Sequence, residues 1–265
     1  MSISMTIPTN TSPQRDIHST DDDITNRCRI ILIVNSAQAA EIDAVALDEI
    51  LKAGDVASII FTPQSPSQSD VSQNNDGLMD EAIWQPLLEP LVEITQKNDV
   101  AAIVSEYSRT AGRVSADGFQ LGQDPQSIEA AIKKYAPKMM IGASNVKTRH
   151  NAMVIGELQP AYLMFGKPGG DIRPEPHPKN LALGEWWASM VEISAVVLGG
   201  NQIESVVEVA NTGVEFVALS AAIFAPNDHV IEIAGAAKRL QQANQHLDEH
   251  APRFIPSSLH PPDKS

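Results

Sequence analysis

The amino-acid sequence predicts an α/β protein, a (β/α)8 TIM barrel in which parallel strands alternate with helices. Three observations support this prediction. Eight apolar runs are bounded by turn residues, helix-like segments separate most of these runs, and a length of 265 residues suits one such barrel. An open doubly wound sheet is the alternative fold, but the number of strands favours the barrel.

The predicted strands are mostly apolar at successive positions, as expected for strands that are buried on both faces of a parallel sheet. They span residues 29–35, 57–62, 100–106, 116–122, 138–144, 161–166, 194–200 and 215–220. The third connection, "YSRTAGRV", has room for only a turn or two of helix. Residues 230–250 predict a last helix that closes the barrel.

The other connections carry apolar residues at spacings of three and four, which indicates amphipathic helices. In chain order, this spacing begins at Ile42, Ile83, Ile128, Met153, Leu183 and Ile203.

Both ends of the chain differ from its middle in composition. Residues 1–27 are rich in Ser, Thr, Pro and Asp and lack a sustained apolar period, which predicts a disordered tail. Residues 251–265 are rich in Pro and Ser and predict a loose C-terminal tail. The barrel domain is therefore expected over residues 28–250. Within it, the polar loop at 62–78 has a length that is typical of functional loops or insertions.

The net charge argues against two classes of partner. A formal charge of -14 disfavours nucleic acid and anionic membrane surfaces, because a negative protein repels polyanions. No apolar run approaches the roughly 20 residues of a spanning helix, and the N-terminus lacks the pattern of a secretion signal. Cys28 is the single cysteine, which fits a reducing compartment. A cytoplasmic protein is expected, and a homo-oligomer stays open.

Functional residues of such a barrel follow the carboxyl ends of the strands. Gly199 and Gly200 end the seventh predicted strand, where the lack of Cβ atoms lets backbone N–H groups approach an oxyanion. Leu219 and Ser220 end the eighth, and "LSAAIF" can begin a short helix whose amides face the same place. These four residues predict a site for a substrate phosphate.

Three stretches of the chain carry a family resemblance: "ADGFQLGQD", "IGASNVKTRHNAMVIGELQPAYLMFG" and "VVLGGNQIESVVEVANTGVEFVALSAAIF". Together they resemble the thiamine-phosphate synthase and thiazole tautomerase family, whose members are (β/α)8 barrels. The resemblance implies a transferase of thiamine biosynthesis. Such an enzyme joins an aminopyrimidine methyl pyrophosphate to a thiazole phosphate, with Mg2+ and with release of pyrophosphate. The implied partners are small phosphorylated heterocycles.

The resemblance also implies roles for single residues. Ser144 corresponds to a serine that follows the fifth strand of the family. Asp124 corresponds to an aspartate that helps to bind Mg2+ and pyrophosphate, and Glu106 keeps one carboxylate of an Asn-Asp pair after the third strand. A carboxylate is a suitable ligand for a hard cation. The family's residues for thiazole phosphate correspond to Gly200, Leu219 and Ser220.

The chain departs from the family pattern in its cations. The family has Arg and Lys after the second strand, whereas "TPQSPSQSD" contains neither. After the sixth strand, "GKPGGDIRPEPHPKN" offers Lys167, Arg173 and Lys179 in place of the family's lysine, and Arg173 lies nearest in spacing. Arg173 and Lys179, with Ser144, are the expected catalytic residues.

These departures leave three functions open. The first is a synthase with a rebuilt pyrophosphate site. The second is a thiazole tautomerase, for which His150 and His177 are the candidate histidines. The third is a non-catalytic protein that binds a phosphorylated heterocycle. Asp124 has a structural alternative as well, because an aspartate before Pro125 can cap a helix that starts there.

Overall fold

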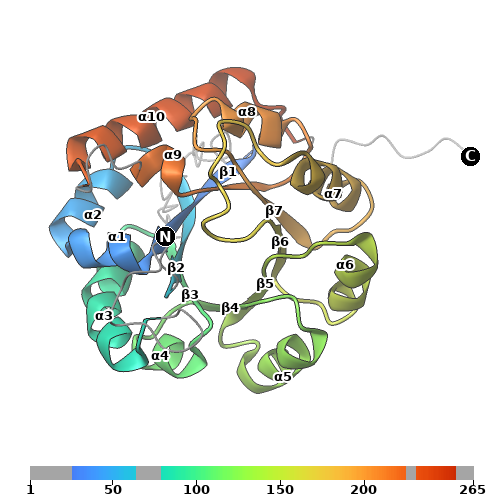
Figure 1. Cartoon of the computed structure of the whole chain (residues 1–265), viewed down its shortest axis with the longest axis horizontal. Helices are drawn as coiled ribbons and strands as arrows, with labels where there is room; N and C mark the ends of the chain where they lie inside the picture. Colours follow the sequence, from blue (N-terminus) through green and yellow to red (C-terminus); the bar gives the residue numbers. More distant parts are fainter. Residues whose placement is uncertain (1–25, 64–78, 225–230, 255–265) are drawn as a thin grey trace, which may run out of the picture.

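The eight strands close into one parallel barrel, as the sequence predicts (Figure 1). The computed structural model describes residues 26–63, 79–224 and 231–254. Neighbouring strands pair in chain order, and the eighth strand pairs with the first. The strands are β1 (Arg29–Asn35), β2 (Val56–Thr62), β3 (Ala101–Ser105), β4 (Gly118–Leu121), β5 (Met140–Ala143), β6 (Tyr162–Phe165), β7 (Ser194–Leu198) and β8 (Phe216–Leu219).

The strands are buried on both faces, which explains their continuous apolar runs. In β1, Ile30 and Leu32 pack in the layer between the strands and the helices. Ile31 and Ile33 belong to a second cluster, which fills the barrel interior with side chains from other strands. Successive side chains of a strand point to opposite faces of the sheet, so each apolar run contributes both to the layer under the helices and to the barrel interior.

The helices surround the barrel (Figure 1). The short α4 and the long α10 match their predicted lengths, and a one-turn α9 follows β8 as expected from "LSAAIF". None of the described helices is long and apolar enough to cross a membrane. The helices are α1 (Ser36–Glu41), α2 (Ala44–Leu51), α3 (Glu81–Lys97), α4 (Ser108–Arg113), α5 (Pro125–Tyr135), α6 (Arg149–Gly156), α7 (Pro178–Ala188), α8 (Ser205–Ala210), α9 (Ala221–Phe224) and α10 (Ile233–His250).

Three predicted features fall largely outside the described residues. Residues 1–25 of the predicted N-terminal tail and 255–265 of the C-terminal tail lie there, as does most of the loop at 62–78. The disorder of the tails and the boundaries of the domain therefore stay predictions. Within the described part, Arg27 is buried, although it falls at the end of the predicted tail.

Cys28 lies at the start of the barrel and is 1% exposed. Burial raises the pKa of its thiol to about 12, so the reactive thiolate is scarce at neutral pH. We expect Ellman's reagent to leave the folded protein unlabelled and to label one thiol per chain in guanidinium chloride. Rapid labelling of the native protein, with circular dichroism showing an intact fold, would contradict the burial of Cys28.

Candidate active site

A small cavity opens at the carboxyl ends of strands β2 to β6, the end at which barrel enzymes place their active sites. Its volume is about 60 Å³. The cavity is lined by Thr62, Ser105, Glu106, Gln120, Gly122, Ser144, Asn145, Lys167 and Pro168. Three of the residues that the sequence predicts to be functional, Glu106, Ser144 and Lys167, are therefore brought together although they follow three different strands.

The inner part of the cavity is a closed set of polar contacts. Gln120 Nε2 donates to Ser105 Oγ at 3.2 Å, and the hydroxyl of Tyr162 donates to Gln120 Oε1 at 2.7 Å. Burial raises the pKa of Tyr162, so its hydroxyl keeps its proton. A Cβ atom at Gly142 would lie 2.2 Å from Cζ of Tyr162, so this glycine makes room for the ring. The contacts fix Gln120 and Ser105 beneath the cavity.

Sequence reasoning missed this polar set. Gln120 and Tyr162 fall within the predicted strands "ADGFQLG" and "AYLMFG", and neither is among the residues that the sequence predicts to be functional. The available signal was a polar side chain inside a run that is otherwise buried, because such a group needs a hydrogen-bond partner.

Two cavity residues have unusual backbone conformations. Glu106 has a φ of 67° and Asn145 has a φ of 58°, a region that residues other than glycine seldom adopt. Their amides are held by neighbouring strands: Glu106 N donates to Gln120 O, and Asn145 N donates to Gly166 O. Desolvation raises the pKa of the Glu106 carboxyl. Backbone strain of this kind often accompanies a functional site.

Ser144 is 5% exposed and is bonded to β4. Its backbone N–H donates to Leu121 O at 2.8 Å, and its Oγ lies 3.1 Å from the same oxygen. The hydroxyl is therefore oriented by the protein before any ligand binds.

The structure separates the three cations that follow β6. Lys167 lines the cavity, whereas Arg173 and Lys179 do not. Arg173 is exposed, and Lys179 is exposed in the first turn of α7. The candidate histidines also lie outside the cavity lining. His177 caps α7 by accepting from Lys179 N, and His150 is exposed on α6.

Asp124 caps α5 in the way that its position before Pro125 allows. Its Oδ2 accepts from the N–H of Ser127 at 3.0 Å and from the Ser127 hydroxyl at 2.5 Å. These contacts lower the pKa of the Asp124 carboxyl. Asp124 does not line the cavity that holds Glu106. Within the described ranges, no three acidic, histidine or cysteine side chains are grouped as a metal site.

The four residues of the predicted phosphate site lie together beyond β7 and β8. Gly200 N donates to Ser205 Oγ at 3.0 Å, and Ser220 Oγ lies 3.3 Å from Gln38 Nε2. Gly199 N bonds to the adjacent strand through Ala218 O. A Cβ atom at Gly199 would lie 2.8 Å from Leu219 Cδ2, so Gly199 packs closely against the end of β8. We call the region of Gly199, Gly200, Leu219 and Ser220 the β7–β8 corner.

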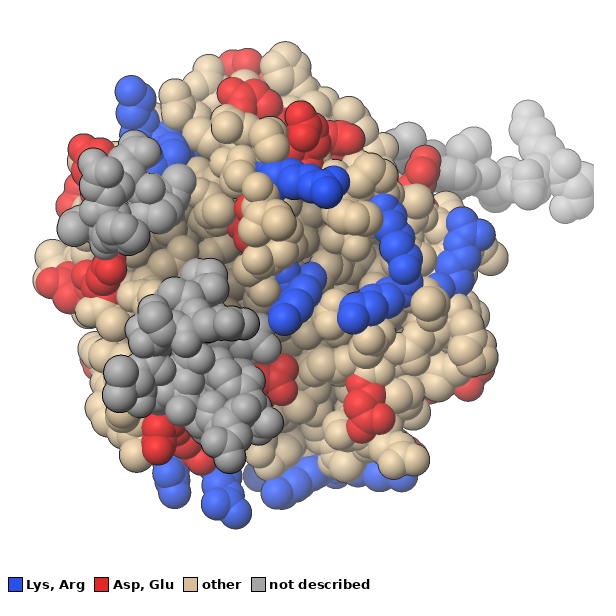
Figure 2. All heavy atoms as spheres, viewed as in Figure 1, with Lys and Arg blue, Asp and Glu red and all other residues tan. Residues whose placement is uncertain are grey.

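Basic side chains gather around one side of the barrel mouth. Figure 2 shows Lys and Arg side chains to the right of the centre, over β5, β6, α6 and α7. The described cations that follow β5 and β6 in the chain, up to the start of α7, are Lys147, Arg149, Lys167, Arg173 and Lys179. The positive charge thus lies opposite β2, where the family resemblance implied cations that this chain lacks.

Comparison with known proteins decides the family. Residues 30–223 match the family described as thiamine monophosphate synthase. The chain belongs to this family. A family relative from Hyphomonas neptunium, thiamine-phosphate synthase, is 27% identical over 205 residues, which cover 76% of this chain and 88% of the relative. The thiamine-phosphate synthase of Erythrobacter litoralis is 34% identical over 149 residues, or 54% of this chain and 68% of the relative.

A solved structure agrees with the fold of this thiamine monophosphate synthase family member. Thiamine phosphate pyrophosphorylase from Pyrococcus furiosus superposes with a TM-score of 0.62 at 21% identity, covering 85% of this chain and 99% of that one. The predicted resemblance to the family is therefore confirmed. The roles of single residues rest on their geometry and are taken up below.

Proposed function

We propose that the protein is a thiamine-phosphate synthase, a transferase that joins an aminopyrimidine methyl pyrophosphate to a thiazole phosphate and releases pyrophosphate. The observation that carries this proposal is the cavity that gathers Glu106, Ser144 and Lys167 at the carboxyl ends of the strands in a chain of this family. Its substrates would be small phosphorylated heterocycles. The single buried cysteine suits a cytoplasmic setting.

Lys167 and Ser144 would hold the leaving pyrophosphate. An ammonium group and an oriented hydroxyl at the same cavity can stabilise the negative charge that grows on the departing oxygens. Arg173 and Lys179 would contribute from outside the cavity lining; all three cations are exposed, so the position of Lys167 at the cavity rather than its burial favours it. In the family, cations after the second strand bind the pyrophosphate; we assign this role to Lys167, Arg173 and Lys179.

Glu106 fits a role in holding Mg2+. Its carboxylate lines the cavity together with Asn145, whose amide oxygen is another hard donor. Mg2+ commonly binds through one or two carboxylates and the phosphates of a substrate, and it would neutralise charge on the pyrophosphate. Asp124 would serve as a second ligand only by giving up its bonds to Ser127. Glu106 is therefore the stronger candidate.

The phosphate of the thiazole would lie at the β7–β8 corner, where barrels of this type commonly bind phosphate. Gly200 and Ser220 border this place, and the Leu219 side chain is buried in the layer between the strands and the helices.

The decisive experiment incubates purified full-length protein with Mg2+ and both heterocyclic substrates. We expect thiamine phosphate and pyrophosphate in equal amounts, and loss of both products when EDTA removes the metal. Absence of product, with thiazole phosphate still raising the melting temperature, would reject the synthase and leave a binding protein. Glu106→Gln tests the proposed Mg2+ ligand, because it keeps the size of the side chain and removes its charge.

A further inference from the structure

The segment that follows β6, residues 166–177, crosses the barrel mouth before it reaches α7 (Figure 1). We call it the β6 loop. It begins at Gly166, whose φ of 122° suits glycine. A turn follows, in which Gly170 N donates to Lys167 O at 2.8 Å. Lys167, at the start of the loop, lines the cavity. The residues after Gly170 contact the segments that follow β7 and β8.

Asp171 joins the β6 loop to the segment after β8. Asp171 is buried, with 5% of its surface exposed, and its Oδ2 accepts from Ala221 N at 2.6 Å. The donor is the residue that directly follows Ser220. A hydrogen bond from an amide to a carboxylate is charge-assisted and stronger than one between neutral groups. A buried anion of the protein thus occupies the amide next to the β7–β8 corner.

Backbone carbonyls of the β6 loop also accept hydrogen bonds from two amides that follow β7. Asn201 N donates to Arg173 O at 2.7 Å, and Gln202 N donates to Pro174 O at 3.4 Å. A Cβ atom at Gly200 would lie 1.9 Å from Pro174 O, so the glycine is needed for the close approach of the loop. The amides of Asn201 and Gln202, next to Gly200, are thus bonded to the β6 loop, whereas those of Gly199 and Gly200 are bonded to Ala218 O and Ser205 Oγ.

We propose that Asp171 determines specificity at the acceptor site by competing with the substrate phosphate for the amide of Ala221. The inference rests on the proposed function for its choice of substrate. A carboxylate and a phosphate accept from the same N–H group and repel each other, most strongly where water is excluded. The phosphate therefore binds only when Asp171 leaves Ala221, and the carboxylate lowers the affinity for phosphorylated acceptors.

The test compares the full chain with Asp171→Asn and Asp171→Ala. Asparagine keeps the size of the side chain and removes its charge, and alanine removes the acceptor as well. Binding of inorganic phosphate, thiazole phosphate and the same thiazole without phosphate is measured by calorimetry. Asp43→Asn is the matched control: Asp43 accepts from the N–H of Ala46 at the start of α2, and the change removes one negative charge from another capping carboxylate. Circular dichroism checks the fold of each variant.

We expect both Asp171 variants to bind thiazole phosphate and inorganic phosphate about tenfold more tightly than the parent chain. Affinity for the unphosphorylated thiazole should stay within about twofold, and Asp43→Asn should leave all three affinities unchanged within about twofold. Equal or weaker phosphate binding by both folded Asp171 variants would overturn the inference. A similar gain for the unphosphorylated thiazole would also overturn it, because opening of the loop rather than charge would then explain the effect.

The inference and the proposed function can fail separately. A parent chain that makes thiamine phosphate, with Asp171 variants that gain no phosphate affinity, would reject only the competition. A chain that makes no product, with Asp171→Asn binding phosphate more tightly, would reject the synthase and support the competition.

Discussion

Replacing Lys167 with Met is expected to lower kcat/KM for the pyrophosphate substrate by about 100-fold to 1,000-fold. Lys167 is the one cation among the described residues that line the cavity, and the methionine keeps much of the side-chain length. A positioned donor to negative charge that develops in the transition state contributes about 2.7–4 kcal/mol, which corresponds to this range of rates. The loss should therefore fall on kcat as well as on KM. Steady-state assays of product formation measure both.

Two further lysine variants show whether position or charge is responsible. Lys179→Met removes a candidate cation at the start of α7, outside the cavity lining, and Lys133→Met removes an exposed charge that pairs with Glu129 on α5. Lys133→Met should change kcat/KM by less than about twofold. A larger loss in Lys179→Met than in Lys167→Met would assign the pyrophosphate to the start of α7 and contradict the placement made from the cavity.

The barrel could be predicted because its strands carry their own signal. Strands that are buried on both faces are apolar along their length, and the observed bounds of β1 equal the predicted ones. The short α4 could also be predicted, since only a few residues separate two apolar runs. Local sequence therefore determines most of this fold, and the closed barrel follows from eight such strands.

Part of the site could not be predicted because it depends on contacts between distant segments. The three cations after β6 are close in sequence, and only the fold shows that Lys167 lines the cavity while Arg173 and Lys179 do not. Asp171 lies in "PGGDIRP", which reads as a turn, because its partner Ala221 is 50 residues away. Gln120 in β4 and Tyr162 in β6 are likewise distant in sequence, and their hydrogen bond forms only in the folded barrel. Asp124 could be predicted in its structural role, because a helix cap depends on nearby residues alone.

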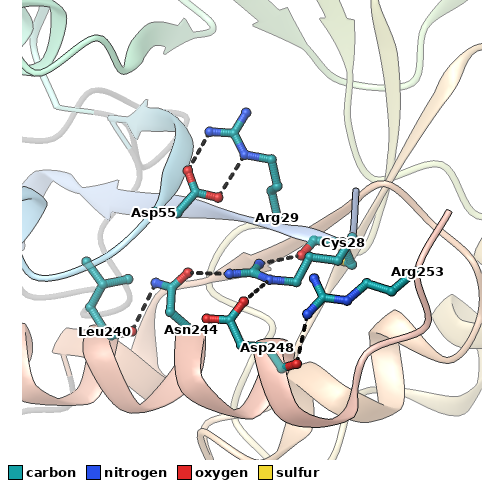
Figure 3. A network of polar contacts seen from close by, with 8 residues as sticks. Cys28, Arg29, Asp55, Leu240, Asn244, Asp248 and Arg253 are labelled. Atoms are coloured by element: carbon teal, nitrogen blue, oxygen red, sulfur yellow. Dashed lines mark hydrogen bonds and ion pairs between the residues drawn. The ribbon is translucent and has the colours of Figure 1, made fainter. Parts of the chain in front are cut away.

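Arg27 is expected to be among the side chains most important for stability, because it joins the start of β1 to α10 (Figure 3). Its guanidinium is 2% exposed and makes three bonds: Nε to Asp248 Oδ1 at 2.7 Å, Nη1 to Cys28 O at 2.8 Å and Nη2 to Asn244 Oδ1 at 3.1 Å. The backbone of Arg27 also forms an antiparallel bridge with Arg253. These contacts hold the last helix against the first strand.

Arg27→Met should lower the free energy of unfolding by about 3 kcal/mol, because it leaves the buried Asn244 and Cys28 oxygens without this donor. Asp248 is 58% exposed and can be solvated by water, which limits the loss to less than that of a fully buried ion pair. For a domain of this size, the melting temperature should fall by roughly 6–12 °C. Arg253→Met is the matched control, because its guanidinium is exposed and donates to the carbonyl of Asp248, so the change should cost less than about 1 kcal/mol. Equal losses for the two variants in urea titrations would show that the buried bonds of Arg27 do not secure α10.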